Sequence, residues 1–299
     1  MSRVLVEMAC QFQTLIRPSL SVTTRITRKV EDPLYRHPEE TFMSAQPAIV
    51  FVHGMYMNGV RWDPWVELAK ARGYQSSAPS WPLHDGRPAE LRANIPEGLG
   101  MLTFGAVVDH LKEIVKGLTT PPILIGHSIG GLVVQKLINE GFGSVVVAIS
   151  PAPPQGILTL DRSFFKANFP HTNPFAGNKP VIMTPERFQY TFCNTMSVVD
   201  SNTAFDRYVV PESRNVPRSR LTKQGHIDFA QEHAPLMVIA GDTDHLVPQP
   251  LIEKNVKAYT GKGIVDFKAF NHRSHFICNQ EGWEQVADFA FDWGQEHAG

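Results

Sequence analysis

Short runs of apolar, mostly β-branched residues recur along this chain from Ala48 onward, and segments with helical character lie between them. The runs at 48–52 and 145–147 contain no polar residue, which is typical of strands covered on both faces. Between them, the segment that starts at Thr103 places its apolar residues on one face at helical spacing. Because strand and helix signals alternate, the sequence predicts an α/β fold with a doubly wound, mostly parallel sheet.

The alternation is interrupted once, between Pro151 and Leu236. Residues 152–231 show no clear strand, and we expect two helical patches there, at about 161–168 and 185–205. We therefore predict an α/β core made of residues 44–151 and 232–299, with residues 152–231 as a mainly helical cap. In the core we expect strands at 48–52, 75–78, 123–125, 144–150, 236–240 and 264–270, and helices that start at Asp63 and Thr103 and that span 129–140, 251–259 and 283–293.

The first 43 residues differ in composition from the rest. Between Met8 and Val30 there are four basic residues and no acidic one, together with several Ser and Thr. Organelle transit peptides have this kind of composition, but a disordered or weakly packed leader, or a start at Met43, accounts for it as well. We favour the simpler leader and a cytoplasmic protein, with organelle import through the leader as the alternative.

Charge and cysteine content narrow the class of partner. The chain has 28 Lys and Arg against 29 Asp and Glu, so it lacks the basic excess that draws proteins to nucleic acid or anionic membranes. No apolar run approaches the ~20 residues of a bilayer span. Cys10, Cys193 and Cys278 are odd in number and far apart, which predicts neither a disulfide framework nor a zinc site. We expect a small-molecule partner, no nucleic acid and no membrane span; the composition does not indicate an oligomeric state.

A candidate nucleophile lies in the segment Gly126-His127-Ser128-Ile129-Gly130-Gly131, which follows one predicted strand and opens a predicted helix. A serine between two such glycines can occupy a strained strand-to-helix turn that exposes its hydroxyl. The start of the following helix also favours negative charge that develops beside it. The alternative is a glycine-rich turn with an idle serine, which the strand and helix around the motif disfavour.

With its other motifs, the sequence resembles the α/β-hydrolase superfamily, in particular its serine hydrolase and esterase branch. The resemblance covers about residues 46–299 and rests on motifs in the family's order. These are His-Gly after an apolar strand, GHSIGG, Gly-Asp-x-Asp after a late strand, and a histidine before the last helix.

The resemblance implies an acid and a base for Ser128, in the chain order Ser, Asp, His. Asp244 fits the family's acid position, with Asp242 as a rival that we expect to hold the turn. His275 fits the base, with His272 as a rival that we expect to be a loop or pocket residue. A serine hydroxyl needs such a base, because it is a poor nucleophile by itself.

The family also implies an oxyanion hole made of two backbone N–H groups. One is that of Ile129, directly after the nucleophile, and the other is that of Met55, in the His53-Gly54-Met55 element after the first strand. No glycine-rich phosphate loop, dinucleotide fingerprint or metal-ligand cluster is present in the sequence, so we expect no cofactor and no metal.

These features predict a cofactor-independent serine hydrolase that cleaves a carboxylic ester through an acyl-enzyme, with lactones or amides as the next candidates. The segment 152–231 is rich in Phe and Met, which favours a small, hydrophobic substrate beneath the cap. The alternatives are a lyase or perhydrolase on the same scaffold, or a ligand receptor with a residual triad.

Overall fold

The computed structural model of the protein describes residues 46–172 and 174–298, and the side chains of 169–174 are left aside. The predicted leader, residues 1–43, lies outside the described residues. Among the described helices, none is both long and apolar enough to cross a membrane.

A six-stranded sheet organises residues 46–298, and all of its strands are parallel. The strand order is β2-β1-β3-β4-β5-β6, so the chain runs outward from β1 to one side and then returns to build the other side. This reversal confirms the doubly wound α/β prediction and creates a switch point between β1 and β3. The strands are β1 (Ile49–Val52), β2 (Ser76–Ser77), β3 (Ile123–His127), β4 (Val145–Ile149), β5 (Leu236–Gly241) and β6 (Val265–Phe270).

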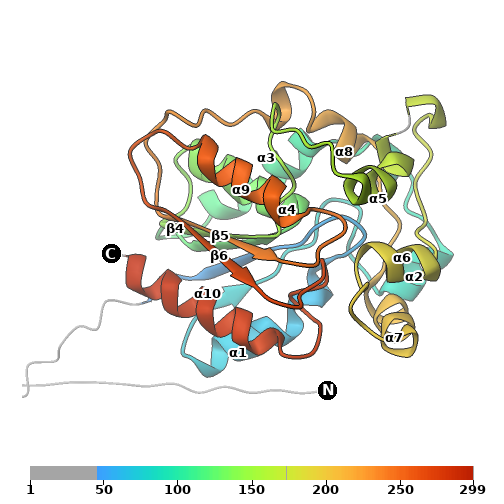
Figure 1. The fold of residues 1–299 in the computed structure, drawn as a ribbon. Helices are drawn as coiled ribbons and strands as arrows, with labels where there is room; N and C mark the ends of the chain where they lie inside the picture. The colour runs from blue at the N-terminus through green and yellow to red at the C-terminus, as the bar shows by residue number, and fades with distance from the viewer. Residues whose placement is uncertain (1–45, 173, 299) are drawn as a thin grey trace, which may run out of the picture. The chain divides into compact units, whose positions relative to one another are not determined.

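Helices cover both faces of the sheet (Figure 1). Helices α1 (Asp63–Ala71) and α10 (Trp283–His297) lie on one face, and α3 (Phe104–Lys116), α4 (Ile129–Asn139) and α9 (Gln249–Ala258) lie on the other. Strand β1 packs against the helices on both faces of the sheet. Phe51 packs against α1 and α10, while Val50 belongs to the apolar cluster on the opposite face. Both strand faces are therefore buried, as their uninterrupted apolar sequences predict.

Local contacts determine where α3 begins and where α10 ends. The Thr103 side chain accepts a hydrogen bond from the Ala106 N–H at 3.3 Å and so caps α3. Helix α10 continues to His297, four residues beyond the predicted end at Trp293 (297 − 293). The last turn remains helical because Trp293 and Gly294 are buried on its inner face.

The segment 152–231 is helical, as predicted, and holds α5 (Arg162–Thr172), α6 (Pro185–Thr191), α7 (Val198–Tyr208) and α8 (Asn215–Ser219). The predicted helical patch at 185–205 is two helices, because Ser197 starts a new one by accepting a hydrogen bond from the Asp200 N–H at 3.1 Å. Short helices at 88–93 (α2) and 215–219 were not expected from the sequence. The exact limits of the core and cap stay predictions.

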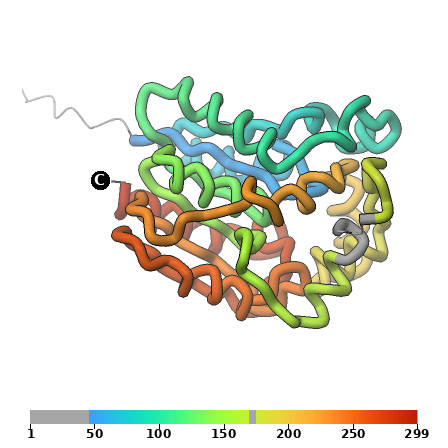
Figure 2. Tube along the Cα trace, turned by 90° about the horizontal axis from the view of Figure 1, so that it is seen from above, coloured from blue at the N-terminus to red at the C-terminus, as the bar shows by residue number. Residues whose placement is uncertain are grey.

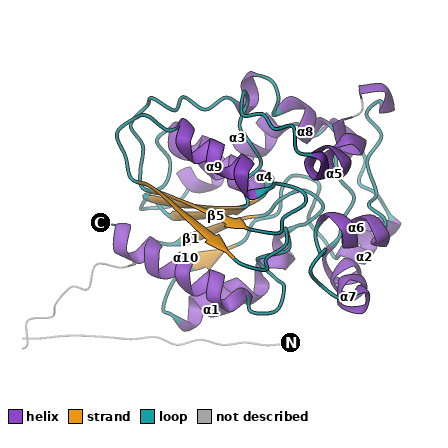
Figure 3. Ribbon diagram, in the orientation of Figure 1, coloured by secondary structure: helices purple, strands orange, loops and turns teal. Residues whose placement is uncertain are grey.

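Helices α5, α6 and α7 lie together at one end of the sheet (Figures 1 and 2). The strand arrows point toward this end (Figure 3). The helical segment therefore lies beyond the carboxyl ends of the parallel strands, which is where α/β sheets bind ligands.

Candidate active site

Ser128 occupies the turn between β3 and α4 with a left-handed backbone, φ 57° and ψ −121°. A non-glycine residue rarely adopts this conformation, which costs about 1–3 kcal/mol and occurs mainly at functional sites. The turn closes tightly around it: a Cβ on Gly126 would lie 2.2 Å from the Gly130 carbonyl oxygen, and one on Gly130 would lie 2.2 Å from that of Val52. Both glycines of the motif are therefore required for the strand and helix to approach.

His275 and Asp244 line up with this serine. The Nε2 atom of His275 lies 2.9 Å from the Ser128 Oγ, and its Nδ1 lies 2.6 Å from the Asp244 Oδ2. A carboxylate only accepts hydrogen bonds, so Nδ1 carries the hydrogen and Nε2 is free to accept the serine proton. The side chains of His275 and Asp244 are both fully buried.

Local backbone groups fix the carboxylate of Asp244. Its Oδ1 accepts hydrogen bonds from the N–H groups of Leu246 at 2.7 Å and Val247 at 2.8 Å. Its Oδ2 is left to face His275. Two backbone N–H groups of the short loop after β5 therefore orient the acid toward His275.

The rival residues do not reach this arrangement. Asp242 is exposed, and its Oδ1 accepts a long hydrogen bond of 3.4 Å from the Arg273 N–H, as expected for a turn residue. His272 is exposed, with a positive φ of 58°. His245 bonds the carbonyl of Tyr190 through Nδ1 at 3.0 Å. Of the predicted alternatives, the structure brings only Asp244 and His275 to Ser128.

The loop after β1 lies against Ser128, as the predicted oxyanion hole requires. A Cβ on Gly54 would lie 2.7 Å from the Ser128 Cβ, so only glycine permits this approach. Tyr56, two residues after Gly54, has a positive φ of 62°. Its N–H donates to the Glu212 carboxylate at 3.1 Å, and its carbonyl oxygen accepts a hydrogen bond from the Val210 N–H at 2.9 Å. The Met55 N–H makes no hydrogen bond to the residues that the structure describes, whereas the N–H of Tyr56 is already used.

Glu212 comes from the helical segment and was not singled out from the sequence. It is fully buried, and its Oε2 also faces the Nε2 of His84 at 3.3 Å. Burial alone would lower the pKa of His84, but the charge of Glu212 and the hydrogen bond to it raise that pKa above its ordinary value. The buried carboxylate of Glu212 therefore connects the helical segment to the loop after β1, because it bonds both His84 and the Tyr56 N–H. Tyr56 and Glu212 are 156 positions apart in the sequence.

A second buried network lies behind His275. Arg61 is fully buried and donates through Nη1 to the His127 Nδ1 at 2.8 Å, and through Nε and Nη2 to the Asn279 Oδ1 at 3.1 and 2.8 Å. Because Arg61 only donates, the other ring nitrogen of His127 carries the hydrogen and donates to the His275 carbonyl at 2.8 Å. Burial, then the charges of Arg61 and His275, lower the pKa of His127 far below its usual range. The ring of His127 lies against that of His275, with ring centroids 4.6 Å apart.

A small cavity of about 30 Å³ opens onto the hydroxyl of Ser128. Its lining is mainly apolar and includes both predicted oxyanion residues. The residues are Met55, Tyr56, Ser128, Ile129, Ala152, Pro153, Phe164, Asn168, Phe192, Pro217, Arg220, Leu246 and Val247.

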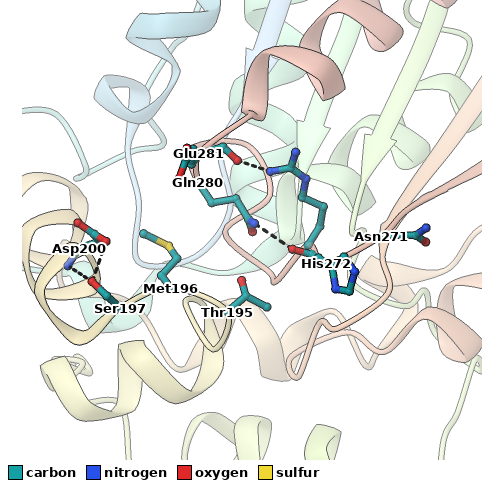
Figure 4. Close-up of a pocket in the computed structure, with 9 residues that line it drawn as sticks. Thr195, Met196, Ser197, Asp200, Asn271, His272, Gln280 and Glu281 are labelled. Carbon is teal, nitrogen blue, oxygen red and sulfur yellow. Dashed lines mark hydrogen bonds between the residues drawn. The ribbon is translucent and has the colours of Figure 1, made fainter.

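A larger, polar groove of about 700 Å³ is lined by none of Ser128, Asp244 and His275 (Figure 4). One wall is formed by Thr195, in the connection between α6 and α7, and by Asp200, in the first turn of α7. The other is the loop after β6, with His272 and Gln280 (Figure 4). Among the described residues, no three His, Cys, Asp or Glu side chains are grouped so as to hold a metal ion.

Known proteins share this fold. The chain matches the model of the alpha/beta hydrolase family over residues 49–289. The monoacylglycerol lipase of Paleococcus ferrophilus is similar with a TM-score of 0.64 and 20% identity, over 85% of this chain and 96% of that chain. Polyneuridine aldehyde esterase has a TM-score of 0.60 and 19% identity, over 83% and 99% of the two chains. Tomato methylketone synthase I, complexed with 2-tridecanone, has a TM-score of 0.64 and 15% identity, over 84% and 99%.

Against proteins of curated function, the sequence has no significant match. The family model nevertheless covers most of the chain, from β1 into α10, and includes the turn that bears Ser128. On this basis, the chain belongs to the alpha/beta hydrolase family.

Proposed function

We propose that the protein is a serine hydrolase that cleaves a small carboxylic ester through an acyl-enzyme. The observation that carries this proposal is the hydrogen-bonded series from Ser128 through His275 to Asp244, with distances of 2.9 and 2.6 Å. Nucleophile, base and orienting acid at these distances are the arrangement that acyl transfer requires.

In the first half of the proposed reaction, the Ser128 Oγ attacks the ester carbonyl carbon and its proton moves to the His275 Nε2. Asp244 stabilises the imidazolium that results, through the hydrogen bond to Nδ1. The carbonyl oxygen becomes negative and accepts hydrogen bonds from the N–H groups of Met55 and Ile129. When the intermediate collapses, the alcohol leaves with the proton from Nε2, and the acyl group stays on Ser128.

In the second half, His275 takes a proton from a water molecule, whose oxygen attacks the acyl carbon. The same two N–H groups hold the new oxyanion. The bond to Ser128 then breaks, its Oγ recovers the proton from Nε2, and the carboxylic acid product leaves. Every step uses only side chains, backbone and water, so the proposal is cofactor-independent.

The cavity supports a compact substrate with apolar parts, because most of its lining is apolar. Its volume of about 30 Å³ is small, which favours a compact substrate. More than half of the lining residues come from segment 152–231, which we therefore propose acts as the cap. The names of the lipase and esterase neighbours support an ester, while the synthase shows that this fold also serves other reactions.

A fluorophosphonate probe tests the nucleophile. We expect one covalent adduct on the peptide that contains Ser128, identified by its mass, and no adduct in Ser128→Ala. Hydrolysis of p-nitrophenyl acetate should follow the same pattern, with turnover by the wild type only. Labelling of another serine, or folded protein that neither labels nor turns over esters, contradicts the proposal and favours a ligand-binding protein.

A further inference from the structure

Arg220 is the one charged side chain among the described residues that line the cavity at Ser128. It follows α8 and is only 4% exposed. Its backbone is held tightly, since a Cβ on Gly225 would lie 1.9 Å from the Arg220 carbonyl oxygen. Its Nη1 bonds the carbonyl oxygen of Pro153, another residue of the cavity lining, so the guanidinium lies beside the cavity.

The polar partners of Arg220 are few. Its Nη1 donates to the Pro153 carbonyl oxygen at 3.0 Å, and this is the only hydrogen bond that its side chain makes to the residues in the described ranges. None of the carboxylates in those ranges forms an ion pair with it. A guanidinium has five N–H donors, so most of its capacity is unused.

Burial lowers the pKa of Arg220 to about 10, so the side chain is still positively charged at neutral pH. A buried charge without a counter-charge is costly, and proteins retain one mainly where it has a function. Arg61 provides the comparison within this molecule: it is equally buried, but His127 and Asn279 accept its hydrogen bonds. Arg220, by contrast, donates one side-chain hydrogen bond, to the Pro153 carbonyl, within the described residues.

We propose that Arg220 binds an anionic carboxylate group of the substrate, so that the protein cleaves esters that carry a second, ionised carboxyl group. The inference rests on the proposed hydrolase function, because it assigns the substrate class of that same site. Arginine matches a carboxylate in a two-point hydrogen-bonded pair. The apolar walls formed by residues such as Phe164 and Leu246 exclude water and strengthen this attraction.

Matched esters test the charge. The monomethyl esters of succinate, glutarate and adipate each carry one carboxylate, and their dimethyl esters have the same chain without the charge. We expect the wild type to prefer at least one monoester over its diester in kcat/KM. In Arg220→Met, kcat/KM for that monoester should fall about 100-fold, while that for the diester should change less than about threefold. Arg220→Lys keeps the charge and should retain part of the preference.

Two results overturn the inference. If Arg220→Met lowers both esters equally, Arg220 supports the fold or the oxyanion rather than a substrate carboxylate. A wild type that prefers every diester also rules it out.

Binding separates this inference from the proposed function. If the wild type hydrolyses no ester, the hydrolase proposal fails by itself. Thermal unfolding of Ser128→Ala with monomethyl glutarate then tests Arg220 alone. A rise in Tm that the diester does not cause, and that Arg220→Met removes, supports the carboxylate site; no such rise overturns it.

Discussion

The ends of the sheet strands and the segment 152–231 both contribute buried polar groups to one site, but they hold them differently. Ser128, Asp244 and His275 each follow a parallel strand, and the register of β3, β5 and β6 brings them to one edge. Glu212 and Arg220 come from the helical segment and are held by single contacts to distant parts of the chain, such as the backbone bridge between Val181 and Glu212 and the bond from Arg220 to the Pro153 carbonyl.

Because the two regions hold their polar groups differently, residues of segment 152–231 can be replaced without moving the strand ends. The positions of the strand ends depend on the whole sheet, so the groups proposed to react are fixed by the fold itself. The helical segment reaches the cavity through a few side chains, and replacing Arg220 alters only one wall of it. We infer that the core supplies the chemistry and that the segment 152–231 supplies selection.

The largest expected effect is in the core. Ser128→Ala and His275→Ala should each lower kcat by about 10⁴-fold or more, because residues that act as a unit fail together. The double variant should be little worse than either single one. Steady-state kinetics on p-nitrophenyl acetate checks this.

His272→Ala is the matched control, since His272 lies three residues before His275 (275 − 272) but is exposed and lines only the polar groove. It should keep kcat within about threefold of the wild type, which is the usual range for a surface change. An inactive His272→Ala with a nearly normal His275→Ala would reverse the assignment of the base.

A smaller effect is expected from Gly54→Ala. The new Cβ would lie 2.7 Å from the Ser128 Cβ and 2.9 Å from the His127 carbonyl oxygen, so the loop with Met55 must move. Loss of one oxyanion donor typically lowers kcat by about 10²–10³-fold, and we expect a fall in this range with little change in KM.

Gly117→Ala provides the control for this change. Its φ of −73° suits alanine, and the nearest atom to a Cβ there lies 3.4 Å away. It should leave kcat nearly unchanged. Equal activity of Gly54→Ala and Gly117→Ala would show that the close approach of the loop to Ser128 is not required. That result would weaken the inference that the core alone supplies the chemistry.

The core and its proposed reacting residues could be predicted because their signals are local. The strands β3 and β5 begin with continuous apolar runs, at 123–125 and 236–240, and the motif around Ser128 has its strand and helix on either side. The edge strand β2 has only two residues, so its extent could not be set by a periodic pattern. The approach of Gly54 to Ser128 joins two strand ends, and the oxyanion hole implied by the family resemblance already placed this loop beside the nucleophile.

The rest of the site depends on contacts that leave no pattern in the sequence. Tyr56 and Glu212 are 156 residues apart, and the segment that holds Glu212 has no regular alternation. Arg220 reads as one more basic residue near Arg214 and Arg218, and only its burial sets it apart. The break between α6 and α7 did have a local signal, because Ser197 and Asp200 are spaced as a helix cap.

The smallest effect should come from the link between the two regions, the buried pair of His84 and Glu212, and it should depend on pH. The pKa of His84 is raised in the folded protein by Glu212, despite burial, and the unfolded value is ~6.5. The charge of His84 therefore stabilises the fold fully below pH ~6.5, and this contribution is lost as the pH rises through the folded pKa. The nearby His53, with its ring 5.7 Å away, stays neutral because burial and then the charge of His84 lower its pKa.

Urea unfolding of the wild type and His84→Gln at pH 6 and pH 9 measures this contribution. The variant should be less stable at both pH values, because Glu212 loses a partner, and the difference should be larger at pH 6. In the Glu212→Gln background the cause of the raised pKa is gone, so the effect of His84→Gln should no longer grow toward low pH. A difference that increases from pH 6 to pH 9 would contradict a protonated His84 in the fold. The helical segment would then be tied to the loop of Met55 by hydrogen bonds to the Glu212 carboxylate without an ion pair, and the two regions would be coupled more weakly than we infer.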